Sequence, residues 1–158
     1  MSRCKKRNPR KLMPDSKYGS ENITKFINIV MEDGKKEVAE KIVYEALAGV
    51  EGKLKEKYGN VADGFNAVIF LVAPTVQTKV RRIGGANYQV PIEVPEYRKI
   101  FMGMKILKKA ANKKKGITMA MALAQEIADA MEEKGEAYKE KVTIQKMALA
   151  NKAYAHLA

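Results

Sequence analysis

The sequence has few of the residues on which catalysis and metal binding usually depend. It contains one cysteine, one histidine and no tryptophan among 158 residues. Cys4 has no second cysteine with which to pair, and we interpret it as a surface thiol without a chemical role. Because a zinc site needs several closely spaced ligands, the lone His156 and the distant Cys4 predict no metal site. Phosphate-loop, HExxH and nucleophile-elbow motifs are also missing, so the sequence predicts neither an enzyme nor a cofactor or small-molecule site.

Long hydrophobic runs are missing as well. The longest, residues 67–73, is far shorter than the ~18 apolar residues that span a bilayer. No hydrophobic stretch follows the basic N-terminus, so it does not resemble a secretory signal. We therefore expect a cytoplasmic protein without a membrane partner, and an organelle of bacterial descent stays open as an alternative. The chain length favours one domain, and nine methionines without tryptophan favour an aliphatic, helical core.

Positive charge is concentrated in two parts of the chain. The formal net charge is +12, from 30 Lys and Arg and 18 Asp and Glu. Residues 1–14 carry six basic and no acidic residues, and residues 75–115 carry eleven basic and two acidic residues. The segments between and after them, 15–74 and 116–158, have net charges of −2 and −1. This segregation is typical of a polyanion-binding protein; improved solubility is the alternative, but it requires no segregation.

Apolar residues recur at helical spacing in six segments. The first runs from Ser20, a predicted N-cap, to Gly34, a predicted stop. The others cover about 36–57, 62–72, 96–112, 118–131 (capped by Thr118) and 143–154, with a break at Gly135 and a basic loop at 113–116. The third segment is apolar on most sides, which indicates a central buried helix.

Between the third and fourth helices the apolar period changes to two. Val76, Thr78 and Val80 alternate with polar residues, and the same pattern returns after Tyr88. The Gly84-Gly85 pair between the two runs supplies the positive φ angles of a tight turn, so residues 75–94 predict a β-hairpin. The predicted fold is mainly α: a compact bundle of about six helices with one projecting basic β-hairpin arm. We expect residues 1–14 to be a disordered basic arm and residues 15–158 to be a single domain.

The predicted hairpin has the composition of an RNA-binding arm. An isolated two-stranded ribbon is marginally stable in water, so we expect it to be mobile alone and ordered against phosphates. Lys79, Arg81 and Arg82 offer charge and the planar fork of arginine. Asn87 and Tyr88 add hydrogen-bonding and stacking groups suited to irregular RNA. A solvated hairpin with incidental charge is the plainer alternative.

Three blocks of sequence resemble the bacterial-type small-subunit ribosomal protein seven family, nearly end to end from about 13 to 156. The first block is Phe26-Ile27-Asn28 with Met31, Asp33-Gly34-Lys35-Lys36, Ala39 and Ile42 to Tyr44. The second, the most specific, runs from Arg81 to Pro91 as RRIGGANYQVP. The third is Met147-Ala148 followed by residues 150–156, ANKAYAH.

The resemblance implies a primary rRNA-binding protein that nucleates the head, the three-prime major domain, of the small ribosomal subunit. It implies that the hairpin and last helix lie near exit-site tRNA and messenger RNA, and that ribosomal proteins nine and eleven are neighbours. From charge and resemblance together, the expected rRNA-binding residues are Arg3, Lys5, Lys6, Arg7, Arg10, Lys11, Lys35, Lys36, Lys79, Arg81, Arg82, Asn87, Tyr88, Arg98, Lys113, Lys114 and Lys115. The residues expected near tRNA and messenger are Gly84, Gly85, Asn151, Lys152, Tyr154 and His156.

Two other functions remain as alternatives. A free-standing nucleoid protein or RNA chaperone would also be basic, but a helix-turn-helix protein would place its cations on one recognition helix. Here they lie on a tail, a hairpin, a helix and a loop. An RNA-modifying enzyme would need a cofactor site or an acid–base pair, and the sequence offers neither.

Overall fold

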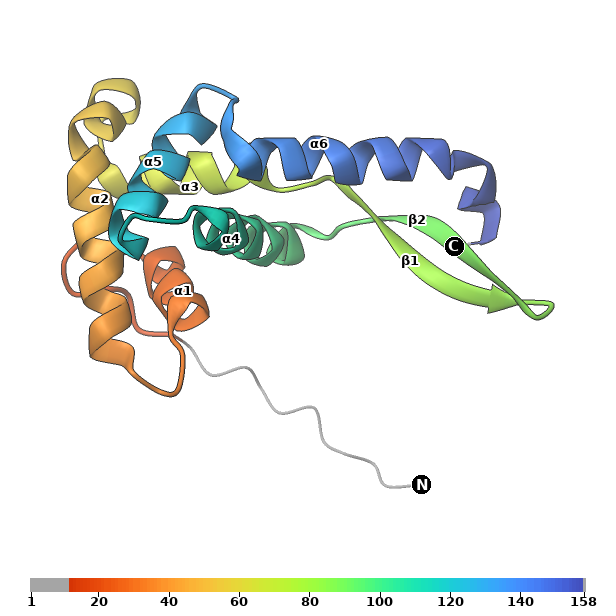
Figure 1. Cartoon of the computed structure of the whole chain (residues 1–158), viewed down its shortest axis with the longest axis horizontal. Coiled ribbons are helices and arrows are strands. Elements are labelled where there is room, and N and C mark those ends of the chain that lie inside the picture. The colour runs from red at the N-terminus through yellow and green to blue at the C-terminus, as the bar shows by residue number, and fades with distance from the viewer. Residues whose placement is uncertain (1–11, 158) are drawn as a thin grey trace.

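The structure is a computed structural model, and it describes residues 12–157. The elements are α1 (Glu21–Val30), α2 (Lys36–Tyr58), α3 (Val61–Val72), β1 (Val76–Ile83), β2 (Ala86–Glu93), α4 (Glu96–Lys113), α5 (Met119–Met131), α6 (Gly135–Ala150) and the 3₁₀ helix η1 (Lys152–Leu157). Helices α1 to α5 gather at one end, and α6 and the hairpin extend from them side by side (Figure 1). The predicted mainly α fold with one hairpin arm is confirmed.

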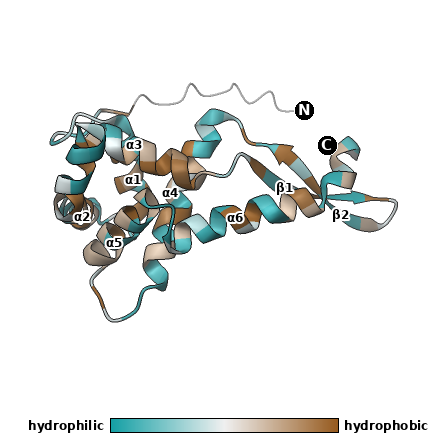
Figure 2. Ribbon diagram, turned by 90° about the horizontal axis from the view of Figure 1, so that it is seen from above, coloured by the Kyte–Doolittle hydropathy of each residue, from teal (hydrophilic) through white to brown (hydrophobic). Residues whose placement is uncertain are grey.

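The predicted apolar stripes meet in one hydrophobic core. In α1 the stripe residues Ile23, Phe26 and Ile27 are buried, and the Phe26 ring centroid lies 5.2 Å from that of Phe65 in α3. Helix α3 contacts α1, α2, α4, α5 and α6, which confirms its central position. One side of α3 faces solvent, however. Phe70 has 51% of its surface exposed, so the prediction of a buried helix fails at this residue. Figure 2 shows hydrophobic and hydrophilic residues mixed along α6, which contacts the largely hydrophobic α3.

Helices α3 and α4 approach closely at a glycine. A Cβ atom added to Gly103 in α4 would lie 2.6 Å from the carbonyl oxygen of Ile69 and 3.1 Å from its Cγ2 atom. No larger residue fits here without movement of the α3 backbone. Gly103 therefore sets the distance between α3, which precedes β1, and α4, which follows β2.

Two helix boundaries differ from the predictions. Helix α1 ends at Val30 rather than at Gly34, because Met31 is already extended and Asp33 and Gly34 form a turn with positive φ angles of 52° and 74°. Helix α6 begins at Gly135 rather than near 143, so the predicted break is its first residue. It ends at Ala150, and the predicted last turn, to Tyr154, is part of η1 instead.

The hairpin has the predicted strands and turn. Its strands are antiparallel in a register that runs from Val76 opposite Glu93 to Ile83 opposite Ala86. Gly84 and Gly85 form the two-residue connection with φ angles of 58° and 88°, values that side chains bearing a Cβ rarely adopt.

The hairpin packs more extensively than the sequence suggested. Strand β1 contacts α6, and β2 contacts η1 (Figure 1). Near its base Val90 and Val94 are buried, whereas residues 79–87 are exposed. The ribbon is therefore supported by α6 and η1 along much of its length, and its mobility in the absence of RNA stays a prediction.

Within residues 12–157, the helices are either too short or too polar to cross a membrane.

Candidate nucleic-acid interface

The outer half of the hairpin presents the predicted cations on both of its faces. Lys79, Arg81 and Arg82 are all exposed on β1. Because side chains alternate along a strand, Lys79 and Arg81 point to one face and Arg82 to the other. The register places Arg81 opposite Tyr88 and Arg82 opposite Asn87. A nucleic acid could thus meet an arginine and a hydrogen-bonding or aromatic group on either side of the ribbon.

The C-terminal segment lies against this arm. The Tyr154 ring centroid is 5.1 Å from that of Tyr88, and Asn151 Nδ2 donates a hydrogen bond to Gln89 Oε1 at 3.5 Å. Lys152 and His156 are exposed on the same short segment, and a ring nitrogen of His156 lies 2.8 Å from the Ala153 carbonyl oxygen. The structure therefore brings together two groups of predicted residues that are separated by more than sixty positions in the sequence.

Lys35 lies in the turn between α1 and α2, as predicted, whereas Lys36 already belongs to α2. Both are exposed; Lys36 is the first residue of α2 and pairs with Glu40 at 3.5 Å. Lys35 lines a groove of about 330 Å³ between the end of α1 and α2. Arg98 is exposed in the first turn of α4.

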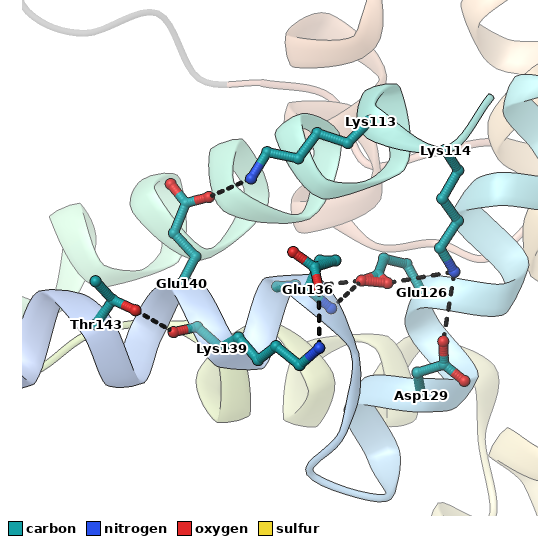
Figure 3. Close-up of polar contacts among 9 residues, drawn as sticks. Lys113, Lys114, Glu126, Asp129, Glu136, Lys139, Glu140 and Thr143 are labelled. Atoms are coloured by element: carbon teal, nitrogen blue, oxygen red, sulfur yellow. Dashed lines mark hydrogen bonds and ion pairs between the residues drawn. The ribbon is translucent and has the colours of Figure 1, made fainter.

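The three lysines of the predicted basic loop have different environments. Lys113 is the last residue of α4 and lies 3.8 Å from Glu140. Lys114 points inward, with its ammonium 3.4 Å from both Glu126 and Asp129 (Figure 3). Lys115 is exposed. Of the three, Lys114 has the least charge available to a partner, because two carboxylates already surround it.

Glu126 is a buried charged residue that the sequence patterns did not identify. Its side chain is fully buried, and its Oε1 atom accepts hydrogen bonds from the backbone N–H groups of Glu136 at 2.7 Å and Ala137 at 3.2 Å. Its Oε2 atom accepts no hydrogen bond of good geometry but lies 3.4 Å from the Lys114 ammonium. Glu126 thus satisfies the first N–H groups of α6 from a neighbouring helix and explains where α6 begins. An acidic residue between Leu123 and Ile127 on an apolar stripe was the available signal.

The neighbouring carboxylate of Glu136 is exposed and has a different role. A hydrogen bond from Lys139, at 3.0 Å, lowers the pKa of Glu136 below its ordinary value. This pair lies at the surface, where such contacts contribute little stability.

The predicted arm residues Arg3, Lys5, Lys6, Arg7, Arg10 and Lys11 lie outside the described residues. Leu12 and Met13 are described, and the Met13 carbonyl accepts a hydrogen bond from Thr24 of α1 at 3.0 Å. The described part of the chain therefore begins beside α1.

Within residues 12–157, exposed cations thus lie on the hairpin, in the turn before α2, and on α4 and the loop that follows it. Comparison with known proteins identifies the family. The model of the family described as ribosomal protein S7p/S5e matches residues 2–152, and the chain belongs to this family. The resemblance seen in the sequence is thus confirmed.

Two relatives illustrate the similarity. The chain is 44% identical over 147 residues to small ribosomal subunit protein uS7 of Aromatoleum aromaticum, covering 93% of this chain and 92% of that protein. It is 44% identical over 156 residues to small ribosomal subunit protein uS7 of Wigglesworthia glossinidia brevipalpis, covering 99% and 98%.

Proposed function

We propose that this protein is a structural constituent of the small ribosomal subunit and binds rRNA with the outer half of its hairpin. The observation that carries the proposal is the exposure of Lys79, Arg81 and Arg82 on an arm that extends from the helical core. Cations on a protruding ribbon reach phosphates without desolvating the core. Family membership and the names of the relatives support the same assignment.

The finer role follows from the resemblance. The protein would bind rRNA early and nucleate the head, with residues 1–14 as a basic arm and the described elements as one folding unit. The hairpin tip, Gly84-Gly85, and the segment from Asn151 to His156 would lie near exit-site tRNA and messenger RNA. The packing of η1 on β2 supports one shared surface for these two segments. Ribosomal proteins nine and eleven would be neighbours, and the site of action would be the cytoplasmic ribosome.

The test of this proposal is co-sedimentation. A tagged chain expressed in a bacterial host should migrate with small ribosomal subunits and should be retained after a wash at high salt. A free-standing nucleoid protein or RNA chaperone would instead remain at the top of the gradient. Binding to duplex DNA and to a head-domain rRNA fragment at one salt concentration provides the second comparison, and equal affinity for the two would contradict the proposal.

A further inference from the structure

A groove between α1 and α4 exposes two aromatic rings at the edge of the core. The groove has a volume of about 540 Å³, and its walls include Leu12, Ile29, Tyr97 and Phe101. Tyr97 has 76% of its surface exposed and Phe101 46%, large fractions for such side chains in a folded protein. The two residues are four apart on α4, so their rings lie on the same face of the helix.

The groove has a basic rim. Lys25 lines it from α1, where its ammonium also lies 4.0 Å from the exposed carboxylate of Glu21, and the Lys105 ammonium lies 4.8 Å from the centroid of the Phe101 ring. Among the described residues that line the groove, none is acidic. The surroundings therefore attract an anion, while the floor offers flat apolar surface.

Two occupants from the chain itself fit poorly. Residues 1–11 are mostly basic and polar and carry little apolar surface with which to cover aromatic rings. A second copy of the chain would bring two basic rims together, at a net charge of +12 on each copy. The occupant needs negative charge and flat apolar faces at once, and an unpaired nucleotide has both.

We infer that Tyr97 and Phe101 form a stacking platform for unpaired bases of single-stranded RNA, whose phosphates pair with Lys25 and Lys105. The inference rests on the proposed rRNA-binding function and adds a second contact surface, separate from the hairpin. Aromatic side chains stack with bases of any sequence, and lysines beside them hold the backbone. The platform is thus a base-dependent site, whereas the hairpin cations are phosphate contacts.

The experiment compares two probes of equal length: a single-stranded oligoadenylate and a ribose-phosphate oligomer without bases. Replacing both rings, Tyr97→Ala with Phe101→Ala, should weaken oligoadenylate binding about fivefold or more and leave binding of the abasic oligomer unchanged. Tyr97→Phe and Phe101→Tyr should bind like the parent, because each keeps its ring. Phe70→Ala is the matched control: Phe70 is a similarly exposed aromatic residue on α3, away from this groove.

A fluorescent variant provides an independent measurement. The chain has no tryptophan, so Phe101→Trp introduces the only indole. Oligoadenylate should quench its fluorescence, and the abasic oligomer should not. If Phe101→Ala fails to fold, Tyr97→Ala alone carries the binding test, because Tyr97 is mostly exposed.

Three results would overturn the inference while leaving the proposed function intact: equal weakening for both probes, unchanged oligoadenylate binding by the double variant, or a loss of self-association in the double variant while its RNA binding persists. A parent protein that fails to bind rRNA would instead contradict the proposed function itself.

Discussion

The Tyr88 ring on β2 packs against the Tyr154 ring in η1, with centroids 5.1 Å apart and planes inclined by 54°. One position further along β2, the side chain of Gln89 accepts a hydrogen bond from Asn151. These contacts tie the C-terminal segment to the hairpin near the point where its exposed outer half begins. The C-terminal segment therefore sets how much of the arm is held by the protein and how much is left for a partner.

Removing either ring should loosen the arm without unfolding the core. Tyr88→Ala and Tyr154→Ala should each speed amide hydrogen exchange in residues 79–88, and exchange in α3 should stay slow. An aromatic pair contributes about 0.5–1.5 kcal/mol beyond its buried area, so a double-mutant cycle on the opening free energy should give a coupling in that range. Tyr97→Ala, at an exposed position on α4, is the control. Additive effects of the two substitutions would show that the rings do not act together.

Neutralising the hairpin arginines should weaken RNA binding selectively. Arg81→Ala with Arg82→Ala should reduce affinity for a head-domain rRNA fragment by about 1–3 kcal/mol. The slope of log affinity against log salt should fall by roughly 0.7–0.9 for each phosphate that the protein no longer neutralises. Lys41→Ala with Lys53→Ala removes the same charge from exposed positions on α2 and should change affinity much less. If the two double variants bind alike, only net charge matters.

Reversing the charge of Lys35 and Lys36 separates an interface from a folding role. Lys36→Glu would place a like charge four residues from Glu40, at a cost of about 0.2–0.5 kcal/mol. An acid at the first position of α2 would also gain about 0.3–1 kcal/mol from the helix dipole, so the two effects largely cancel. We expect the melting temperature to change little and rRNA affinity to fall several-fold. If the melting temperature and the rRNA affinity fell together, these lysines would have a role in folding instead.

Local patterns predicted the fold well where the determinants are near in sequence. The stripe through Ile23, Phe26 and Ile27 and the Gly84-Gly85 turn each depend on a few adjacent residues, and both were confirmed. The start of α6 was missed because its capping group, Glu126, comes from another helix. The packing of Tyr154 on the hairpin depends on residues far apart in the chain, which periodicity cannot detect.

The candidate site, too, could be predicted only where it depends on residues near in sequence. The charge of the hairpin is evident from the sequence, and strand alternation even places Arg81 and Arg82 on opposite faces. The inward orientation of Lys114 is not evident, because it depends on the buried carboxylate of Glu126. A run of three lysines predicts a basic loop, but only the fold determines which of the three remains available.

Gly103→Ala should destabilise the protein even though alanine is the better helix former. In an open helix this substitution gains about 0.8–1.0 kcal/mol. Here the added methyl group would lie 2.6 Å from the Ile69 carbonyl oxygen, a backbone atom that moves only with α3. Overpacking of this kind costs about 1–3 kcal/mol, so we expect a net loss in the free energy of unfolding. Gly52→Ala on α2, where nothing lies within 4 Å of the new atom, should stabilise instead. Denaturant unfolding of both variants checks the opposite signs.

Glu126 should be the costliest acidic residue to replace. Glu126→Ala leaves the N–H groups of Glu136 and Ala137 without their acceptor and the Lys114 ammonium without its buried partner, so we expect a loss of about 3–5 kcal/mol in the free energy of unfolding. Glu126→Gln keeps an acceptor oxygen for α6 but removes the charge that faces Lys114, and it should cost less. Denaturant unfolding with Glu56→Ala, an exposed site on α2, as the control measures both.

Lys114 separates the two contributions within this pair. Lys114→Met leaves a buried carboxylate without its cation in the parent background, but it should cost little when combined with Glu126→Gln, because no charge then remains to be balanced. A coupling near zero between the two substitutions would show that the α6 N–H groups alone hold Glu126. If Lys114→Met weakened rRNA binding as strongly as the hairpin substitutions while leaving stability unchanged, Lys114 would belong to the interface despite its contacts with Glu126 and Asp129.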